Sequence, residues 1–296
     1  MMILSWANHR VSVRGHSFNT YYKEPSKGPL FVFHHGMGSS ALTFALLCTE
    51  LSKQLPDAGF LAFDARFHGT SRPLEQSPPS FAVDDLILDF KAVVNSFNVS
   101  SEVSLVLVGH SMGGTIVSKV CTEKEWKNTS GVVVIDAVEG YAKQSLAKMP
   151  QLVGSWPTSF VDDAEAVNWA LHHLVRNKES ALISIPHTLK ALSNGRKGFV
   201  VDLIPTSQYW DGWFDGLDAA FLSSPASRLL ILAGTGRLDK EMMVGQMQGK
   251  YRLVALPECG HFLHEDNPGR VAEVIMEFWL RNSAPAIITP KFGAFR

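Results

Sequence analysis

The sequence Gly-His-Ser-Met-Gly-Gly at residues 109–114 constrains the fold of this chain more than any other segment. It directly follows an apolar run, Ser104–Val108, and precedes residues 115–120, whose pattern suits a helix. Gly-x-Ser-x-Gly between a strand and a helix is typical of a sharp turn with a strained, exposed serine at its tip. Glycines are needed beside it because the strand and the helix approach each other closely. We therefore predict that Ser111 is a nucleophile.

The strand before Ser111 is one of several short apolar runs, each followed by a turn and a helical pattern. Runs that are apolar at successive residues predict strands covered on both faces, and hence a mostly parallel sheet with helices on both sides. Ahead of them, two alternating segments predict an antiparallel hairpin at the sheet edge. The predicted parallel strands are Leu30–His34, Phe60–Asp64, Ser104–Val108, Val132–Asp136, Arg228–Ala233 and Tyr251–Leu256, and the hairpin strands are Leu4–Val13 and Ser17–Tyr22.

A long segment between the fourth and fifth of these strands has helical patterning and no convincing strand. Asp162–His172, for example, starts with acidic residues and continues with apolar residues at helical spacing. The segment is too long for an ordinary loop and too short for an independent domain, which predicts a helical cap. Sites in open α/β sheets lie at the carboxyl ends of the strands, where a cap would shape the pocket. We expect a core of residues 1–139 and 226–296 and a cap of residues 140–225.

Composition excludes several function classes. The 296 residues include 27 basic and 28 acidic side chains, and this balance gives no electrostatic argument for nucleic acid or an anionic membrane. The apolar run at the N-terminus is too short for a signal peptide, and no apolar stretch is long enough to span a bilayer. The isolated Cys48, Cys121 and Cys259 favour reduced thiols in the cytoplasm or nucleus over a disulfide scaffold or zinc site. No metal or organic cofactor is expected.

A nucleophilic serine needs a histidine base and an acid that orients it. His261 follows the last predicted strand, which places the histidine last in chain order. His264 is a competitor, but the Gly-His step at the start of the loop favours His261. Two acids follow strand ends: Asp136, and Asp239 one strand later. Spacing alone slightly favours Asp239, and the other acid is expected to cap a helix or bond within a loop.

The tetrahedral intermediate of such a reaction needs two backbone N–H donors for its oxyanion. One is expected from Met112, the residue after the nucleophile, and the other from Met37 in the turn at residues 34–38. Two adjacent histidines open that turn, His34 and His35. Neighbouring side chains on a strand point to opposite faces, which disfavours a metal site there.

Two further segments carry polar or aromatic residues of uncertain role. Asp64, Arg66 and His68 are expected to hold a loop beside the oxyanion turn, with direct substrate contact as the alternative. Residues 208–216 contain Tyr209, Trp210 and Trp213, as well as a phenylalanine and two acids. These aromatic rings either pin the cap to the sheet or line a groove for a peptide or acyl group. The sequence leaves both interpretations open.

Together these residues resemble the protein phosphatase methylesterases, a family within the α/β-hydrolase superfamily. The resemblance extends well beyond the serine turn, over about residues 30 to 280. Tyr-Trp-Asp-Gly-Trp-Phe and Gly-Gln-Met-Gln-Gly-Lys are its most specific sequences. The segments that carry it are Ile135–Gly140, Tyr209–Phe214, Leu232–Gly234, Arg237–Lys240, Gly245–Lys250 and Cys259–Asp266.

The resemblance implies an α/β-hydrolase fold and a serine carboxylesterase. Its substrate would be the C-terminal leucine methyl ester of the catalytic subunit of protein phosphatase 2A. It also implies that Asp136, rather than Asp239, is the triad acid. We further expect a monomer in which Trp210, Trp213 and Gln246 contact the substrate. The alternatives are a general carboxylesterase or lipase of this fold, or a phosphatase-binding regulator with little catalysis.

Overall fold

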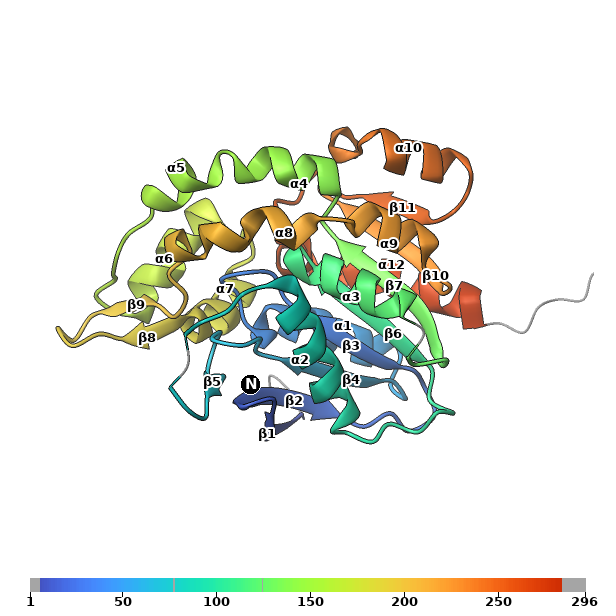
Figure 1. Ribbon diagram of the computed structural model, residues 1–296, viewed down its shortest axis with the longest axis horizontal. Helices are drawn as coiled ribbons and strands as arrows, with labels where there is room; N and C mark the ends of the chain where they lie inside the picture. Colours follow the sequence, from blue (N-terminus) through green and yellow to red (C-terminus); the bar gives the residue numbers. More distant parts are fainter. Residues whose placement is uncertain (1–5, 77, 124, 284–296) are drawn as a thin grey trace, which may run out of the picture.

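The computed structural model describes residues 6–76, 78–123 and 125–283. At its centre is a nine-stranded sheet in the order β1-β2-β4-β3-β6-β7-β10-β11, with β5 paired to β2 (Figure 1). β1 and β2 are antiparallel, as are β2 and β4. The neighbouring strands β4, β3, β6, β7, β10 and β11 are all parallel. The strands are β1 Ala7–Val13, β2 His16–Lys23, β3 Leu30–His34, β4 Gly59–Phe63, β5 Arg72–Pro73, β6 Leu105–His110, β7 Thr129–Ile135, β8 Leu189–Ala191, β9 Lys197–Phe199, β10 Ser227–Leu232 and β11 Arg252–Ala255.

The predicted fold class is confirmed, with a parallel sheet, an N-terminal antiparallel hairpin and helices on both faces. The first residues of the predicted strand Leu4–Val13, and the chain beyond Ser283, lie outside the described residues. The helices are α1 Ala45–Gln54, α2 Val83–Asn95, α3 Met112–Thr122, α4 Glu139–Leu146, α5 Met149–Gly154, α6 Asp163–His173, α7 Lys178–Ser184, α8 Trp210–Phe214, α9 Leu217–Ser223, α10 Lys240–Met247, α11 Leu263–Asp266 and α12 Pro268–Ser283, with 3-10 turns η1 Ala41–Phe44, η2 Ile185–Thr188, η3 Ile204–Tyr209 and η4 Thr235–Arg237.

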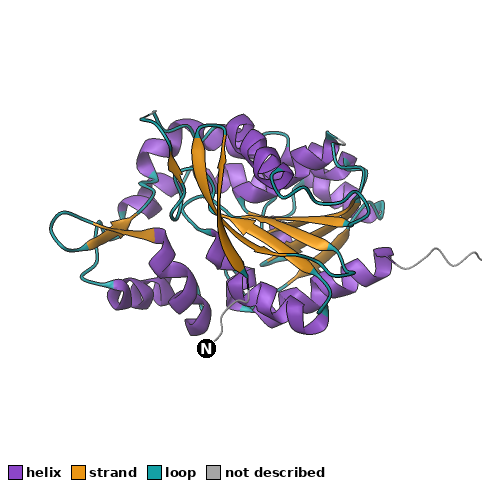
Figure 2. Ribbon diagram, turned by 90° about the horizontal axis from the view of Figure 1, so that it is seen from below, coloured by secondary structure: helices purple, strands orange, loops and turns teal. Residues whose placement is uncertain are grey.

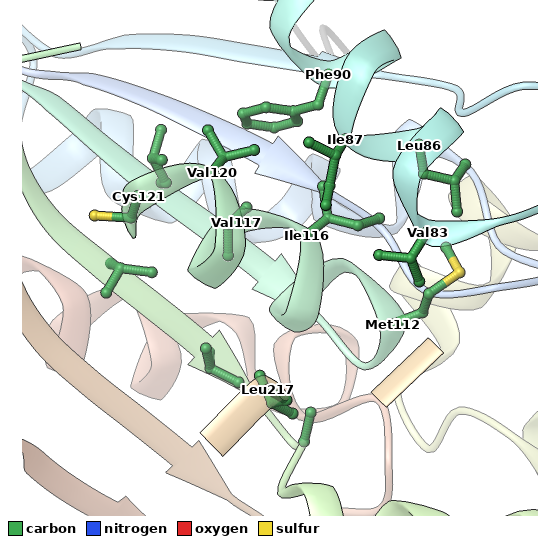
Figure 3. Close-up of a cluster of buried hydrophobic side chains, with 14 of the residues drawn as sticks. Val83, Leu86, Ile87, Phe90, Met112, Ile116, Val117, Val120, Cys121 and Leu217 are labelled. Atoms are coloured by element: carbon green, nitrogen blue, oxygen red, sulfur yellow. The ribbon is translucent and has the colours of Figure 1, made fainter. Parts of the chain in front are cut away.

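Alternate residues of the central strands pack into two separate hydrophobic clusters. On one face, Val32 and Leu107 pack with α2, α3 and α9, and Figure 3 shows side chains of α2 and α3 meeting. On the other face, Phe33 and Val108 pack with α1 and α12. Each of these four side chains is fully buried. Burial on both faces explains why the strands are apolar at successive residues, and the two helical layers hold the carboxyl ends of the strands in fixed positions.

The segment between β7 and β10 forms two differently packed parts. Its middle has a small core of its own around Phe160, Val167 and Ala181, and a hairpin of β8 and β9 stands apart from the main sheet (Figure 2). The sequence-based expectation of no strand in this segment was wrong. The hairpin strands have three residues each and contain lysines, so they lack an alternating pattern long enough to recognise. The end of the segment, α8 and α9, packs on α3 within the core.

Among the described residues, no helix combines the length and hydropathy that crossing a bilayer requires.

Candidate active site

Ser111 lies at the tip of the turn between β6 and α3, with φ 53° and ψ −124°. This left-handed conformation is strained for serine. It is held because the Ser111 amide donates to Ile135 O at 2.9 Å and Gly114 N donates to Ser111 O at 2.8 Å. A Cβ on Gly109 would lie 2.2 Å from the carbonyl oxygen of Gly113, and a Cβ on Gly113 would lie 2.1 Å from that of His34. The structure therefore contains the close strand–helix approach that the glycines of the motif predict.

Replacing Gly113 with alanine is expected to destabilise the protein by about 3 kcal/mol or more, because the added methyl group would meet backbone that cannot move away. Gly212 in α8 is a matched control, since a Cβ there would meet no atom within 4 Å. Gly212→Ala is expected to leave stability unchanged or to raise it by up to about 1 kcal/mol. Urea unfolding of both variants measures the difference. Equal unfolding midpoints would contradict the packing described for this turn.

Asp136 contacts the predicted histidine base. It directly follows β7, and its φ of 52° is also left-handed. Its Oδ2 accepts a hydrogen bond from His261 Nδ1 at 2.8 Å, and its Oδ1 accepts one from Ala233 N at 2.9 Å. Because Nδ1 carries the donated proton, Nε2 of His261 is the nitrogen able to accept one. Since β6 and β7 are parallel neighbours, Ser111 and Asp136 lie at the same edge of the sheet.

Asp239, the acid that spacing favoured, has a different environment. Its side chain caps α10, accepting from Met242 N at 3.0 Å, and also accepts from Gly140 N at 3.1 Å. Burial and a hydrogen bond to Asp239 raise the pKa of the neighbouring Asp218 to about 8. Asp239 thus joins α10 to the start of α4, whereas His261 is bonded to Asp136.

The loop that carries His261 is fixed on several sides. His110, which directly precedes Ser111, bonds through Nε2 to the carbonyl oxygen of His261 at 3.0 Å. Asp266 accepts from Gly260 N at 2.6 Å and from Arg176 N at 2.7 Å. Burial lowers the pKa of His110 well below 6.5, so its ring is neutral and donates one hydrogen. These contacts tie the histidine loop to the serine turn and, through Arg176, to the segment after α6.

The turn at residues 34–38 lies directly against Ser111. A Cβ on Gly36 would be 3.0 Å from Ser111 Cβ. Two buried histidines hold this turn, with His35 Nδ1 bonded to Gly36 O at 2.7 Å and Gly38 N donating to His68 Nε2 at 3.0 Å. Burial lowers the pKa of each to about 3, so both remain neutral. Met112 begins α3, where a backbone N–H has no partner within the helix.

The neighbouring loop is held as the sequence suggested. Asp64 accepts hydrogen bonds from Ala41 N at 2.8 Å and Thr70 N at 3.0 Å, and Arg66 pairs with Asp89 at 2.5 Å. His34 bonds through Nδ1 to the carbonyl oxygen of His35 at 2.8 Å. All these groups are buried and bonded within the protein, which supports a structural role over substrate contact. Among the described residues there is no cluster of side chains that could hold a metal ion.

A cavity of about 50 Å³ lies between the turn at residues 34–38 and the segment between β7 and β10. Its lining is mainly apolar and comprises Met37, Gly38, Ser39, Trp156, Leu174, Val175, Ser184, Ile185, Thr188, Phe199, Leu203, Phe262 and Glu265. Trp210 and Trp213 are not part of it: they are buried, and their indole N–H groups bond to Thr206 Oγ1 and to a main-chain carbonyl, each at 2.9 Å. Gln246 is exposed on α10. Substrate contact by these three residues stays a prediction that their positions do not support.

Sequence reasoning missed two charged residues at this site. Arg237 Nη1 donates to Asp136 Oδ2, the oxygen that also bonds to His261. Glu265 lines the cavity and bonds to the hydroxyl groups of Thr43 in η1 and, at 2.6 Å, Ser184 in α7. Arg237 lies in a segment that carries the family resemblance, Arg237–Lys240, but nothing in the sequence assigned it a contact with Asp136. Glu265 lies in another such segment, Cys259–Asp266, and its role was missed because its partners are far away in sequence.

Burial raises the pKa of Glu265 to about 8, from an ordinary value of 4.5. Between about pH 4.5 and 8, the folded state therefore keeps the Glu265 proton that the unfolded state has lost. The contribution of this protonated carboxyl group to the free energy of unfolding is complete below about pH 4.5 and is lost as pH rises through about 8. Glu265→Gln keeps the shape but cannot ionise. Relative to the variant, wild type is expected to lose up to about 1.4 kcal/mol per pH unit across that range. Urea unfolding at several pH values tests this, and parallel stability curves would contradict it.

This chain is similar to known proteins in both sequence and structure. The Alpha/beta hydrolase family model matches residues 31–274. The crystal structure of E-2-(acetamidomethylene)succinate hydrolase has a TM-score of 0.73 and 18% identity, covering 92% of this chain and 98% of that one. A thioesterase domain from the curacin biosynthetic pathway has a TM-score of 0.70 and 18% identity, covering 92% of this chain and 100% of that one. At such identities the likeness establishes the fold.

Curated sequences are more closely related. Protein phosphatase methylesterase 1 of Schizosaccharomyces pombe is 41% identical over 303 residues, covering 98% of this chain and 88% of the relative. The proteins of that name in Yarrowia lipolytica and Saccharomyces cerevisiae are 40% and 39% identical, covering 95% and 91% of this chain and 72% of each relative. The chain therefore belongs to the protein phosphatase methylesterase family of α/β-hydrolases, and it is a serine esterase.

Proposed function

We propose that this protein removes the methyl ester from the C-terminal leucine of the catalytic subunit of protein phosphatase 2A. Ser111 is the nucleophile, His261 the base and Asp136 the acid. The observation that carries the proposal is the 2.8 Å bond between His261 Nδ1 and Asp136 Oδ2, at the sheet edge where Ser111 lies. The relatives named protein phosphatase methylesterase 1 supply the class of substrate.

In the first half of the proposed reaction, His261 Nε2 takes the hydroxyl proton of Ser111 as the serine oxygen attacks the ester carbonyl carbon. The backbone N–H groups of Met37 and Met112 stabilise the resulting oxyanion, each contributing about 3 kcal/mol to transition-state stabilisation. The amino end of α3 also favours negative charge at this point. His261 returns the proton to the methoxide oxygen, the carbon–oxygen bond breaks, and methanol leaves an acyl-enzyme.

In the second half, water attacks the acyl-enzyme while His261 accepts its proton. The Ser111 oxygen then leaves with that proton, and the product is a free C-terminal carboxylate. Methanol is too small to supply specificity, so recognition depends on the peptide and on docking of the phosphatase. We propose that the segment of residues 140–225 shapes this access as a cap on the core of residues 1–139 and 226–296, through its middle part around Phe160, Val167 and Ala181, since α8 and α9 pack within the core. The small apolar cavity beside Met37 supports this placement.

The direct test is to incubate the protein with methylated phosphatase catalytic subunit and to measure the remaining methyl ester by mass spectrometry. Long-chain acyl esters serve as the comparison substrate. We expect rapid demethylation and slow turnover of the long-chain esters. The reverse preference would indicate a general carboxylesterase or lipase. Tight phosphatase binding with neither activity would indicate a regulator with little catalysis.

A further inference from the structure

The carboxylate of Asp136 receives a second charged partner besides His261. Arg237 Nη1, from η4, donates to the same Oδ2 that bonds to His261. Oδ1 is bonded to Ala233 N, so both carboxylate oxygens are held. The Asp136 side chain has no exposed surface, and that of Arg237 is 24% exposed. An ion pair between a buried carboxylate and a partly buried arginine side chain fixes geometry more strongly than an exposed pair does.

The other side of Arg237 faces the segment that begins the proposed cap. Its guanidinium carbon lies 5.2 Å from the centre of the Tyr141 ring, a cation–π arrangement. Tyr141 belongs to α4, which starts three residues after Asp136 in the sequence. Two residues beyond Arg237, Asp239 accepts from Gly140 N in the same helix. Arg237 therefore lies between the acid and α4, and its loop is fastened to that helix at two points.

We propose that Arg237 is a positioning residue for the esterase reaction: it fixes the Asp136 carboxylate, and thereby His261, and links both to α4 through Tyr141. The inference rests on the proposed triad. The carboxylate must present Oδ2 to Nδ1 so that Nε2 faces the serine, and the guanidinium removes the freedom of the carboxylate to turn away. Misplacing a catalytic group by about 1 Å can reduce a rate by about 10²-fold.

Two buried histidines lie near His261 in addition to Arg237. Burial lowers the pKa of His110 well below 6.5 and that of His264 to about 3, so both are neutral. On the loop's outer side, Asp266 bonds to the Gly260 and Arg176 amides.

The test compares Arg237→Gln, Arg237→Lys and Tyr141→Leu in the full-length protein. Arg270→Gln is the matched control, since it removes an arginine whose partner is the exposed Glu273. The first readout is the rate at which a small fluorophosphonate inactivates the serine, which needs no phosphatase. The second is kcat and KM for demethylation of the methylated catalytic subunit. Thermal unfolding of each variant identifies any loss of folded protein.

For Arg237→Gln we expect fluorophosphonate inactivation and kcat to fall together by roughly 10²-fold, with KM unchanged. Arg237→Lys is expected to recover most of the rate, Tyr141→Leu to lose a smaller part, and Arg270→Gln to match wild type. Wild-type rates in Arg237→Gln would overturn the proposal, as would losses that merely follow unfolding. If the wild-type protein reacts with the fluorophosphonate but does not demethylate the catalytic subunit, the proposed substrate is overturned. The inactivation rates of the variants would still test the role of Arg237.

Discussion

Ser111→Ala is expected to abolish demethylation, with a decrease in kcat on the order of 10⁶-fold, because no other group at the turn can form the acyl-enzyme. The variant should fold normally, since alanine at the tip makes no new contact and keeps the backbone bonds of Ser111 to Ile135 and Gly114. Binding of the phosphatase catalytic subunit should persist, because the hydroxyl group is a minor part of any docking surface. Kinetics of methyl ester loss and a pull-down with methylated subunit measure the two properties separately.

Ser118→Ala provides the matched control for that experiment. Ser118 is a buried serine in the same helix, α3, and its hydroxyl bonds to Gly114 O at 2.7 Å. Its removal is expected to cost about 1 kcal/mol of stability and to leave kcat within a few-fold of wild type. Residual demethylation by Ser111→Ala at the level of Ser118→Ala would contradict the assignment of the nucleophile.

Asp136→Asn is expected to lower kcat by about 10⁴-fold, because an amide in place of the carboxylate favours the wrong tautomer of the histidine. The structure gives a specific reason: Oδ2 accepts from both His261 Nδ1 and Arg237, and an amide nitrogen there would face two donors. The effect should appear in kcat more than in KM, since Asp136 is fully buried beneath the histidine. Demethylation rates under single-turnover conditions measure it without interference from product release.

Asp239→Asn distinguishes this assignment from the alternative acid. Asparagine is also a good helix cap, so the contact with Met242 N is expected to persist and stability to change by less than about 1 kcal/mol. We expect demethylation within a few-fold of wild type. If Asp239→Asn lost activity as severely as Asp136→Asn, the acid would be misassigned or shared.

Patterns local in sequence predicted much of this fold. The parallel strands β3, β4 and β6 were recognisable because both of their faces are buried, as for Val32 and Phe33 on opposite sides of β3. The serine turn was recognisable because its glycines have a steric cause that the sequence itself reveals. The β8–β9 hairpin was not, since strands of three residues with lysines carry no clear period.

The choice between the two acids shows what spacing lacks. Asp136 and Asp239 both follow strand ends, and both bond to backbone groups, so each satisfies the same local rule. In the structure they differ in their partners: Asp136 is bonded to His261, which is far away in sequence, whereas Asp239 is bonded to Met242 N and Gly140 N. The family resemblance had already pointed to Asp136 through its neighbouring residues. The hydrogen bond between His261 and Asp136 supports that proposal.

Side-chain roles were the least predictable part. The tryptophans of residues 209–214 could be recognised as important, but burial in the core rather than exposure in a groove depends on how α8 meets α3. Arg237 and Glu265 were missed for a related reason. A single charged residue in a loop has no distinguishing pattern, and its role follows from partners such as Asp136 or Ser184 that only the folded chain brings within reach.

The most direct measurement of the central claim is demethylation of the methylated phosphatase catalytic subunit in water enriched in the heavy oxygen isotope. Attack by Ser111, followed by water on the acyl-enzyme, predicts one heavy oxygen in the product carboxylate and none in the methanol. It also predicts a Ser111 ester on a rapidly quenched peptide, absent from Ser111→Ala. Heavy oxygen in the methanol, or wild-type demethylation by Ser111→Ala, would contradict the account.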